Sequence, residues 1–182
     1  VWEVIDAAST KPFGYMPFYP GPGLGGHCIP IDPFYLTWKA REFGKHTRFI
    51  ELAGEINTSM PEYVVNIVAG VLNGKSKSVN GAEILMLGLA YKANVDDDRE
   101  SPSYRLIELL EQLGAVVSYN DSYIPVIKPS REYSHYSGRT SKEISDDYDL
   151  VLLSTAHDEY KEYDFSEYKA LFVDTRNAIQ IK

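Results

Sequence analysis

The sequence has a single cysteine, Cys28, among its 182 residues. One thiol excludes an internal disulfide and a zinc site built from cysteines. It also fits a reducing compartment, so we expect a cytoplasmic protein. Positive charge is scarce as well: 18 Lys and Arg face 26 Asp and Glu, for a formal net charge of −8. A general nucleic-acid binder carries a basic face, so this charge disfavours that class and leaves room only for a local cationic pocket that binds phosphate.

The sequence also lacks the segments that direct a chain to a membrane. No apolar run approaches the roughly 20 residues that a membrane-spanning helix needs, so no membrane partner is expected. The opening VWEVIDAAST is acidic, without the basic leader of a signal peptide. Val1, Val4, Ile5 and Ala8 follow helical spacing from the first residue, which indicates the end of a helix that began earlier. We therefore expect the chain to be part of a longer protein.

Proline and glycine break up the first part of the chain. Residues 10–32 hold five prolines and five glycines and predict a loop. A helix then follows, capped by Asp32 and ended by Gly44. Two further helical patterns lie within residues 47–73, where Pro61 either kinks one long helix or starts a second. Their broad apolar face is typical of packing between domains or subunits, and we expect a homodimer or a higher homo-oligomer.

Beyond a polar linker, GKSKSVNG, the pattern changes to short apolar runs around one clearly bounded helix. Ser101 caps this helix, Pro102 begins it and Gly114 ends it. The expected strands are AEILMLGLAY, AVVSYND, YDLVLLST and ALFVDT. Strand–helix–strand alternation predicts a mostly parallel sheet with helices on both faces. The fold class is therefore α/β, with a helical segment over residues 1–75 and a Rossmann-like three-layer α/β/α domain over residues 79–182.

The stretch GPGLGGHC places Cys28 at the end of a glycine-rich loop. Gly21, Gly23 and Gly26 match the G-x-G-x-x-G fingerprint of dinucleotide sites, but that fingerprint follows a strand, and the prolines before it exclude one. The glycines instead let main-chain amides approach a ligand and leave space for it. Cys28 is then either a small buried apolar residue or a thiolate favoured by the helix N-terminus that follows.

The two polar neighbours of Cys28 each have two interpretations. Asp32 either caps the helix or takes part in chemistry. His27 is adjacent to Cys28, so we expect the two side chains to diverge, which argues against a protease-like Cys–His pair. His27 is then either structural or in contact with a substrate.

Cationic residues lie where two predicted strands end. Lys92 and Arg99 are in GLAYKANVDDDRESP, after the first strand, and Arg176 is in FVDTRN, after the last. Ligands of open α/β sheets bind at the carboxyl ends of strands, so these cations suit an anion such as a pyrophosphate. Alternatively, they balance the acidic residues 96–98 and 100. The acidic run lacks the spacing of a calcium loop, so no metal is expected.

Three motifs, PGPGLGGHCIPIDP, GLAYKANVDDDRESP and DTRN, resemble in order and spacing the UDP-glucose/GDP-mannose dehydrogenase family. The form GGHCIPIDP is similar to the branch that acts on UDP-N-acetylglucosamine or UDP-N-acetylmannosamine. UDP-glucose enzymes more often carry Ser before the cysteine and Lys before the aspartate. The resemblance implies oxidation of the sugar C6 alcohol to the uronic acid with two NAD. It also implies that the family's NAD-binding domain and its catalytic Lys and Asn lie outside this chain, which alone should be inactive.

The resemblance also implies roles for individual residues. Cys28 matches the nucleophile: its thiolate traps the aldehyde as a thiohemiacetal, a second oxidation gives a thioester, and water releases the acid. Asp32 matches a carboxylate that assists water or proton transfer. Substrate contacts are implied for Tyr19, Gly21, Gly23, Leu24, Gly25, Lys92 and Arg176, and NAD contacts for Cys28, Ile29 and Arg99.

Two other functions remain open: a non-catalytic module that captures UDP-sugars, and a UDP-glucose 6-dehydrogenase. The presence of Cys28 with Asp32 favours an enzyme, because a pure binding module needs neither. A structural role of residues 48–73 as a dimer interface is compatible with each of these functions.

Overall fold

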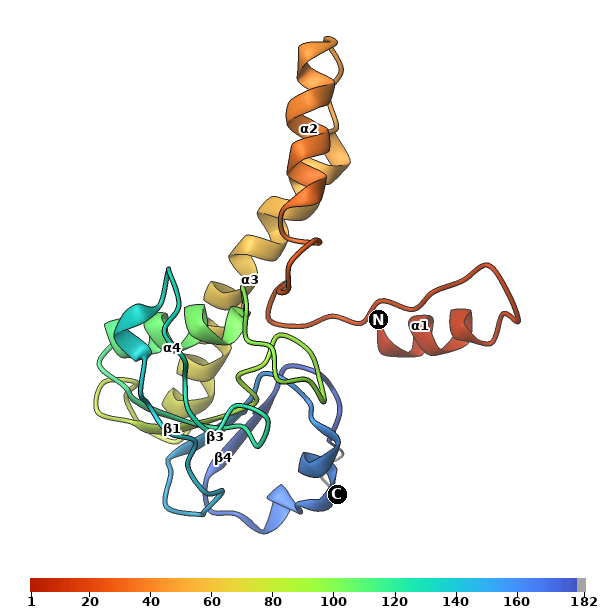
Figure 1. Cartoon of the computed structure of the whole chain (residues 1–182). Coiled ribbons are helices and arrows are strands. Elements are labelled where there is room, and N and C mark those ends of the chain that lie inside the picture. Colours follow the sequence, from red (N-terminus) through yellow and green to blue (C-terminus); the bar gives the residue numbers. More distant parts are fainter. Residues whose placement is uncertain (180–182) are drawn as a thin grey trace.

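The computed structural model describes residues 1–179. A short helix lies on an arm, two helices form a hairpin that projects from the body, and the body holds the sheet (Figure 1). The helices are α1 (Trp2–Ser9), α2 (Asp32–Glu42), α3 (Arg48–Asn73) and α4 (Pro102–Gln112). The strands are β1 (Glu83–Leu87), β2 (Val116–Asn120), β3 (Leu150–Leu153) and β4 (Leu171–Asp174). The predicted α/β class, a helical segment followed by a parallel sheet, is confirmed.

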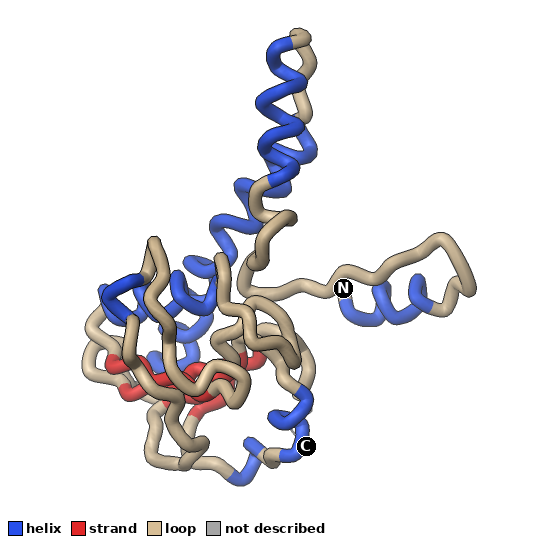
Figure 2. Tube along the Cα trace, in the orientation of Figure 1, coloured by secondary structure: helices blue, strands red, loops and turns tan. Residues whose placement is uncertain are grey.

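The four strands form one parallel sheet in the order β2-β1-β3-β4. They lie together within the body of the molecule (Figure 2). Ile84 at the centre pairs with Val117 on one side and with Leu150 on the other. Strand β2 lies on one side of β1, and β3 and β4 lie on its other side. The strand order therefore reverses between β1 and β3, and the carboxyl ends of these strands form the position where open α/β sheets bind ligands.

Each face of the sheet has its own apolar core, because side chains of a strand alternate between the faces. Ile84 and Met86 of β1 lie in the larger core, together with Leu106 of α4 and Val68 of α3. Leu85 and Leu87 point to the opposite face. There they meet residues of two 3-10 helices, η2 (Asp158–Glu162) and η3 (Phe165–Glu167). The α-helices α3 and α4 therefore cover one face, and short 3-10 helices cover the other.

Helix α3 runs without interruption through Pro61, so the two helical patterns belong to one helix. Its second half is anchored, because Val64, Val68 and Leu72 are buried in the core of the sheet. Its first half extends away from the body, and Phe49 there is 89% exposed. None of the described helices combines the length and the apolar composition that crossing a bilayer requires.

The helix boundaries agree with the sequence except at α2. Ser101 caps α4 by accepting the backbone N–H of Ser103 at 3.3 Å, as predicted. Asp32, by contrast, is the first residue of α2, and Ile31 occupies the cap position without a side-chain hydrogen bond. The prediction that Asp32 caps the helix is therefore wrong by one residue, because the backbone already turns at Ile31. An acidic side chain in the first turn is still favourable beside the positive end of the helix dipole.

Candidate functional site

The glycine-rich loop before Cys28 is docked on the carboxyl edge of the sheet. The backbone N–H of Gly26 donates a hydrogen bond to the carbonyl oxygen of Arg99 at 3.0 Å. A Cβ atom added at Gly25 would lie 2.6 Å from the Cβ of Tyr91, and one added at Gly21 would lie 2.1 Å from a guanidinium nitrogen of Arg176. The loop therefore lies against the segment after β1 and against the end of β4.

This contact revises the interpretation of the glycines. We expected them to leave space for a ligand, but at four positions an added Cβ would meet the chain itself. At Gly23, where φ is +147°, that Cβ would lie 3.1 Å from Pro102 at the start of α4. At Gly26, where φ is +94°, it would lie 2.9 Å from the ring of Tyr91. The absence of side chains lets the loop approach the α/β domain closely, and the ligand then has to bind beside this contact.

Cys28 is exposed at the end of the docked loop, so it is not a buried apolar residue. Its carbonyl oxygen accepts the N–H groups of Ile31 at 3.1 Å and Asp32 at 2.8 Å, which places it one turn before α2. The Cys28 Sγ lies 3.6 Å from Nδ1 of His27, so the prediction that these side chains diverge is wrong. Neighbouring side chains diverge in an extended strand, but residues 26–31 form bends and turns.

Asp32 is joined to Cys28 through the backbone. Its carboxylate is exposed, and within residues 1–179 no hydrogen bond links it to the thiol. Both groups are therefore accessible from the start of α2, with the aspartate one helical turn beyond the cysteine.

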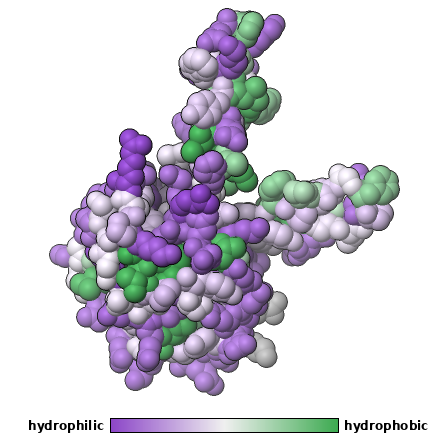
Figure 3. Space-filling view, viewed as in Figure 1, coloured by the Kyte–Doolittle hydropathy of each residue, from purple (hydrophilic) through white to green (hydrophobic). Residues whose placement is uncertain are grey.

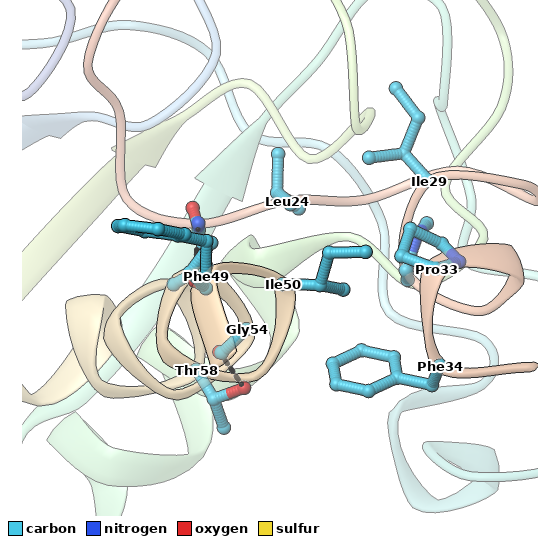
Figure 4. Close-up of a pocket in the computed structure, with 11 residues that line it drawn as sticks. Leu24, Ile29, Pro33, Phe34, Phe49, Ile50, Gly54 and Thr58 are labelled. Atoms are coloured by element: carbon cyan, nitrogen blue, oxygen red, sulfur yellow. Dashed lines mark hydrogen bonds between the residues drawn. The ribbon is translucent and has the colours of Figure 1, made fainter. Parts of the chain in front are cut away.

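The apolar residues predicted at the site lie apart from the cations. Leu24 and Ile29 line a cavity of about 420 Å³ between the loop, α2 and α3, with Phe34 and Phe49 among its walls (Figure 4). Tyr19 lies farther along the arm, where its ring stacks on Trp2 with centroids 6.0 Å apart. The structure thus brings Gly21, Gly23 and Gly25 to the sheet edge but leaves Tyr19 on the arm.

The three predicted cations differ in their surroundings. Arg176 is half-buried, and its Nε donates a hydrogen bond to the carbonyl oxygen of Ser154 at 2.6 Å. Burial lowers the pKa of its guanidinium, although Asp174 opposes this effect. Arg99 is exposed and pairs with Asp97, with its NH2 group 2.6 Å from Oδ2. The hydrogen bond from Arg99 lowers the pKa of Asp97 below its usual value.

Arg99 therefore balances the charge of a neighbouring acidic residue, Asp97, which was the alternative interpretation of the three cations. Lys92 is exposed and forms no side-chain hydrogen bond or salt bridge within residues 1–179. Arg176 likewise has no carboxylate salt bridge in this part of the chain. Lys92 and Arg176 are thus the two strand-end cations that remain available to an anionic ligand.

Arg99 also belongs to a second cavity, of about 770 Å³, whose wall includes His27, Lys128 and Arg131. The same wall also includes Asp98, Glu100 and Glu132, so the cavity has mixed charge. Within residues 1–179, no glycine fingerprint forms the strand–turn–helix unit that binds a whole dinucleotide, because GPGLGG follows an extended arm rather than a strand. The described residues therefore do not form a complete dinucleotide-binding site.

Sequence reasoning missed two buried polar residues at the same edge, Asp121 after β2 and His157 after β3. Both side chains are fully buried, and His157 Nε2 lies 3.0 Å from Asp121 Oδ2. The carboxylate also accepts the backbone N–H groups of Leu89 at 2.7 Å and Ala90 at 2.9 Å. The signal in the sequence was their position: Asp121 directly follows a buried strand, and His157 comes four residues after the end of another.

The hydrogen bonds of Asp121 predict a loss of stability in acid. Burial alone would raise the pKa of Asp121, but hydrogen bonds from His157 and the backbone outweigh it, so the pKa is lowered. A lowered pKa means that the carboxylate stabilises the fold at neutral pH and that this contribution is lost as the pH falls below about 4. Urea unfolding at several pH values measures this effect. We expect the free energy of unfolding to be stable between about pH 7 and pH 5 and to drop below about pH 4.

Asp158→Asn is the matched control, because the pKa of Asp158 is also lowered, by its bond to Lys161, but its side chain is exposed. The acid-induced drop should persist in this variant. Equal stability of the wild type at about pH 3 and pH 7 would contradict the role given to Asp121.

A parallel α/β domain with Lys92 and Arg176 after its strand ends, and an exposed thiol docked at the same edge on a glycine loop, is typical of a nucleotide-binding domain joined to a cysteine-bearing segment. Two family models match the chain. Residues 1–59 match the central domain of the UDP-glucose/GDP-mannose dehydrogenase family, and residues 85–181 match the UDP binding domain of the same family. The chain belongs to this family.

Similar proteins share most of this chain but extend well beyond it. A UDP-N-acetyl-D-mannosamine dehydrogenase of Methanococcus maripaludis is 37% identical over 88% of the chain and 34% of its own length. A UDP-N-acetyl-D-glucosamine 6-dehydrogenase of Pseudomonas aeruginosa is 34% identical over 87% of the chain and 36% of its own length. The solved UDP-D-ManNAc dehydrogenase of Pyrococcus horikoshii superposes with a TM-score of 0.81 at 27% identity, covering 100% of the chain and 41% of that structure. The chain thus spans about a third of the length of these curated relatives.

Proposed function

We propose that this chain is the thiol-bearing and UDP-sugar-binding part of a nucleotide-sugar 6-dehydrogenase that oxidises a UDP-N-acetylhexosamine to the uronic acid. The observation that carries the proposal is the docking of the Cys28 loop on the carboxyl edge of the sheet. Through the contacts of Gly21 with Arg176 and of Gly26 with the backbone of Arg99, the loop that bears the Cys28 thiol lies at the sheet edge that carries Lys92 and Arg176, the proposed ligands of the diphosphate. The 34–37% identity to relatives named for UDP-N-acetylhexosamines supports this substrate class.

In this proposal the two free cations bind the substrate. Lys92 and Arg176 contact the diphosphate or the sugar, where a cation at a strand end offsets the negative charge. The main chain of Gly21, Gly23 and Gly25 lines the path of the sugar nucleotide, with Leu24 and Tyr19 as flanking contacts. Tyr19 reaches this position only if the arm is placed differently when the substrate is bound.

Cys28 performs the covalent steps. Its thiolate adds to the C6 aldehyde, and the carbon–sulfur bond that forms gives a thiohemiacetal. Oxidation of this adduct gives a thioester, and attack by water breaks the carbon–sulfur bond to release the uronate and the thiolate. NAD, when bound, supplies the oxidising power by accepting a hydride in each of the two oxidations. A thiolate suits this sequence because it both adds and leaves readily.

Asp32 assists proton transfer, and Arg99, Ile29 and Cys28 lie beside NAD. Asp32 is exposed one turn after the thiol, where its carboxylate can accept a proton from the attacking water. Arg99 contacts the pyrophosphate from the second cavity, which it shares with His27. The Asp97 carboxylate already binds the Arg99 guanidinium, so a phosphate has to contact the part of the guanidinium that Asp97 leaves free.

Substrate choice tests the proposal. We expect the whole enzyme to prefer a UDP-N-acetylhexosamine to UDP-glucose by about tenfold or more in kcat/KM, because a buried hydrogen bond to the acetamide is absent with glucose. Steady-state kinetics with UDP-glucose, UDP-N-acetylglucosamine and UDP-N-acetylmannosamine measure this ratio. Equal or better turnover of UDP-glucose would show a UDP-glucose 6-dehydrogenase instead, and binding without any turnover would show a non-catalytic module.

The projecting hairpin supports the proposal of a homodimer or a higher homo-oligomer. Hydrophobic side chains follow the hairpin and the arm (Figure 3). Phe49, Leu52, Ile56 and Tyr63 on α3 are all more than half exposed. Exposed apolar side chains that gather along one helix, as these four do, mark an interaction interface. Sedimentation velocity should show a dimer or larger species that Ile56→Lys shifts toward the monomer, whereas a monomeric wild type would remove the interface claim.

A further inference from the structure

The carboxyl edge contains one polar cluster that the proposed chemistry does not use, the buried pair Asp121 and His157. Polar groups without access to water are costly unless hydrogen bonds satisfy them. Here they are satisfied. Nδ1 of His157 accepts the backbone N–H of Asn94 at 2.8 Å, so the proton of the neutral ring lies on Nε2, which donates to Asp121 Oδ2 at 3.0 Å.

This pair connects the segments that follow three different strands. Asp121 comes after β2 and His157 after β3, and both bind the loop after β1, residues 88–94. Asp121 accepts the N–H groups of Leu89 and Ala90 near the start of that loop. His157 accepts the N–H of Asn94 at its end. The loop is therefore fixed near its start by Asp121 and at its end by His157, the two members of one buried pair.

Further bonds hold the same loop. The Thr155 hydroxyl donates to the carbonyl oxygen of Ala90 at 2.6 Å. Asn94 adopts a left-handed backbone conformation, with φ +62°, and its side-chain amide donates to Asp158 Oδ2 at 2.7 Å. The Asn94 amide oxygen accepts the N–H of Asp158 at 3.1 Å. Asparagine tolerates this conformation better than most residues.

Lys92 lies midway between these fixed points, with its side chain exposed. A lysine on a mobile backbone must lose backbone as well as side-chain freedom when it binds a ligand, and this cost weakens binding. We propose that the buried Asp121–His157 pair is a positioning device that fixes residues 88–94, so that Lys92 meets the UDP-sugar with its backbone already in place. The proposal rests on the substrate role of Lys92 given above.

A double-mutant cycle of His157→Phe and Lys92→Ala tests the coupling. Phenylalanine keeps a ring against Tyr123 and Tyr160, whose centroids lie 4.9 and 5.5 Å from that of His157, but removes both hydrogen bonds. Isothermal titration calorimetry of the whole enzyme with UDP-N-acetylglucosamine measures affinity. We expect each single substitution to weaken binding about tenfold, and the double variant to bind no more weakly than Lys92→Ala alone.

Two further variants keep the test decisive. Asp149→Asn is the matched control: Asp149 Oδ2 also accepts a backbone N–H, that of Glu83 at 2.9 Å, but at the opposite edge of the sheet. It should lower the melting temperature and leave the affinity unchanged. Asp121→Asn replaces His157→Phe in the cycle if the latter does not fold, because an amide nitrogen then takes the place of one carboxylate oxygen and cannot accept the hydrogen bonds that this oxygen accepts from the backbone or from His157.

The outcomes separate the positioning role from the substrate role. If the two losses add in the double variant, His157 acts independently of Lys92 and the positioning role is overturned. The same holds if Asp149→Asn weakens binding as much as His157→Phe does, since general destabilisation then explains the loss. If Lys92→Ala leaves the affinity unchanged, the substrate role of Lys92 fails first, and the positioning role fails with it.

Discussion

The Cys28→Ala enzyme is expected to form no detectable uronate, with turnover lower by about 10³-fold or more, because no other residue among these 182 carries a thiol that could form the thioester. Substrate and NAD should still bind. Cys28 is exposed, and within residues 1–179 its side chain forms a single hydrogen-bond contact, at 3.6 Å with His27, so the fold should be unaffected. Steady-state turnover and calorimetric substrate affinity, measured together in the whole enzyme, separate loss of chemistry from loss of binding.

His27→Ala is the control for this loss, because it removes the group that Cys28 contacts and leaves the nucleophile in place. It should retain a measurable part of the wild-type rate. Uronate formation by Cys28→Ala at a rate close to that of the wild type would contradict the role of the thiol.

Gly25→Ala is expected to lower kcat/KM by about 100-fold, since a catalytic group displaced by about 1 Å loses roughly that much. The new Cβ would lie 2.6 Å from the Cβ of Tyr91 and 2.8 Å from the carbonyl oxygen of Glu100. Neither atom is the flexible end of a side chain, so the loop itself has to move. The movement would break the hydrogen bond from Gly26 to Arg99 and displace Cys28 from the sheet edge.

Gly70→Ala is the matched control on α3, where nothing lies within 4 Å of an added Cβ. Replacing a glycine within a helix should stabilise the protein by about 0.5–1 kcal/mol and leave kcat/KM unchanged. Thermal unfolding and steady-state kinetics of the two variants give the comparison. Wild-type kcat/KM in Gly25→Ala would show that close docking of the loop is not needed for catalysis.

The sequence was sufficient where the structure depends on local signals. Ser101 and Pro102 at the start of α4 fixed that helix, and the apolar runs located all four strands. The carboxyl-edge placement of Lys92 and Arg176 followed from strand order alone, since parallel strands end at one edge. At Pro61, local information allowed either a kink or a break, and burial of the following residues against the sheet accounts for one continuous helix.

What the sequence could not reveal depends on contacts between distant segments. The pairing of Asp121 with His157 joins residues 36 positions apart, and neither carries a motif. The glycines of the Cys28 loop gave no sign of what they face, and only the three-dimensional structure places Gly21 against Arg176. The approach of His27 to Cys28 depends on the local turn, which the alternation expected of an extended chain did not anticipate.

The most direct test of the account is intact-mass spectrometry of the Cys28→Ser enzyme after incubation with its UDP-N-acetylhexosamine and NAD. Serine can add to the aldehyde and, after the second oxidation, form an ester. An alkoxide leaves less readily than a thiolate, so this ester should hydrolyse slowly and accumulate. We predict a protein species heavier by the mass of one UDP-linked sugar acyl group, located at residue 28 by peptide mapping. Turnover at the wild-type rate, with no added mass, would contradict the claim that Cys28 carries the substrate.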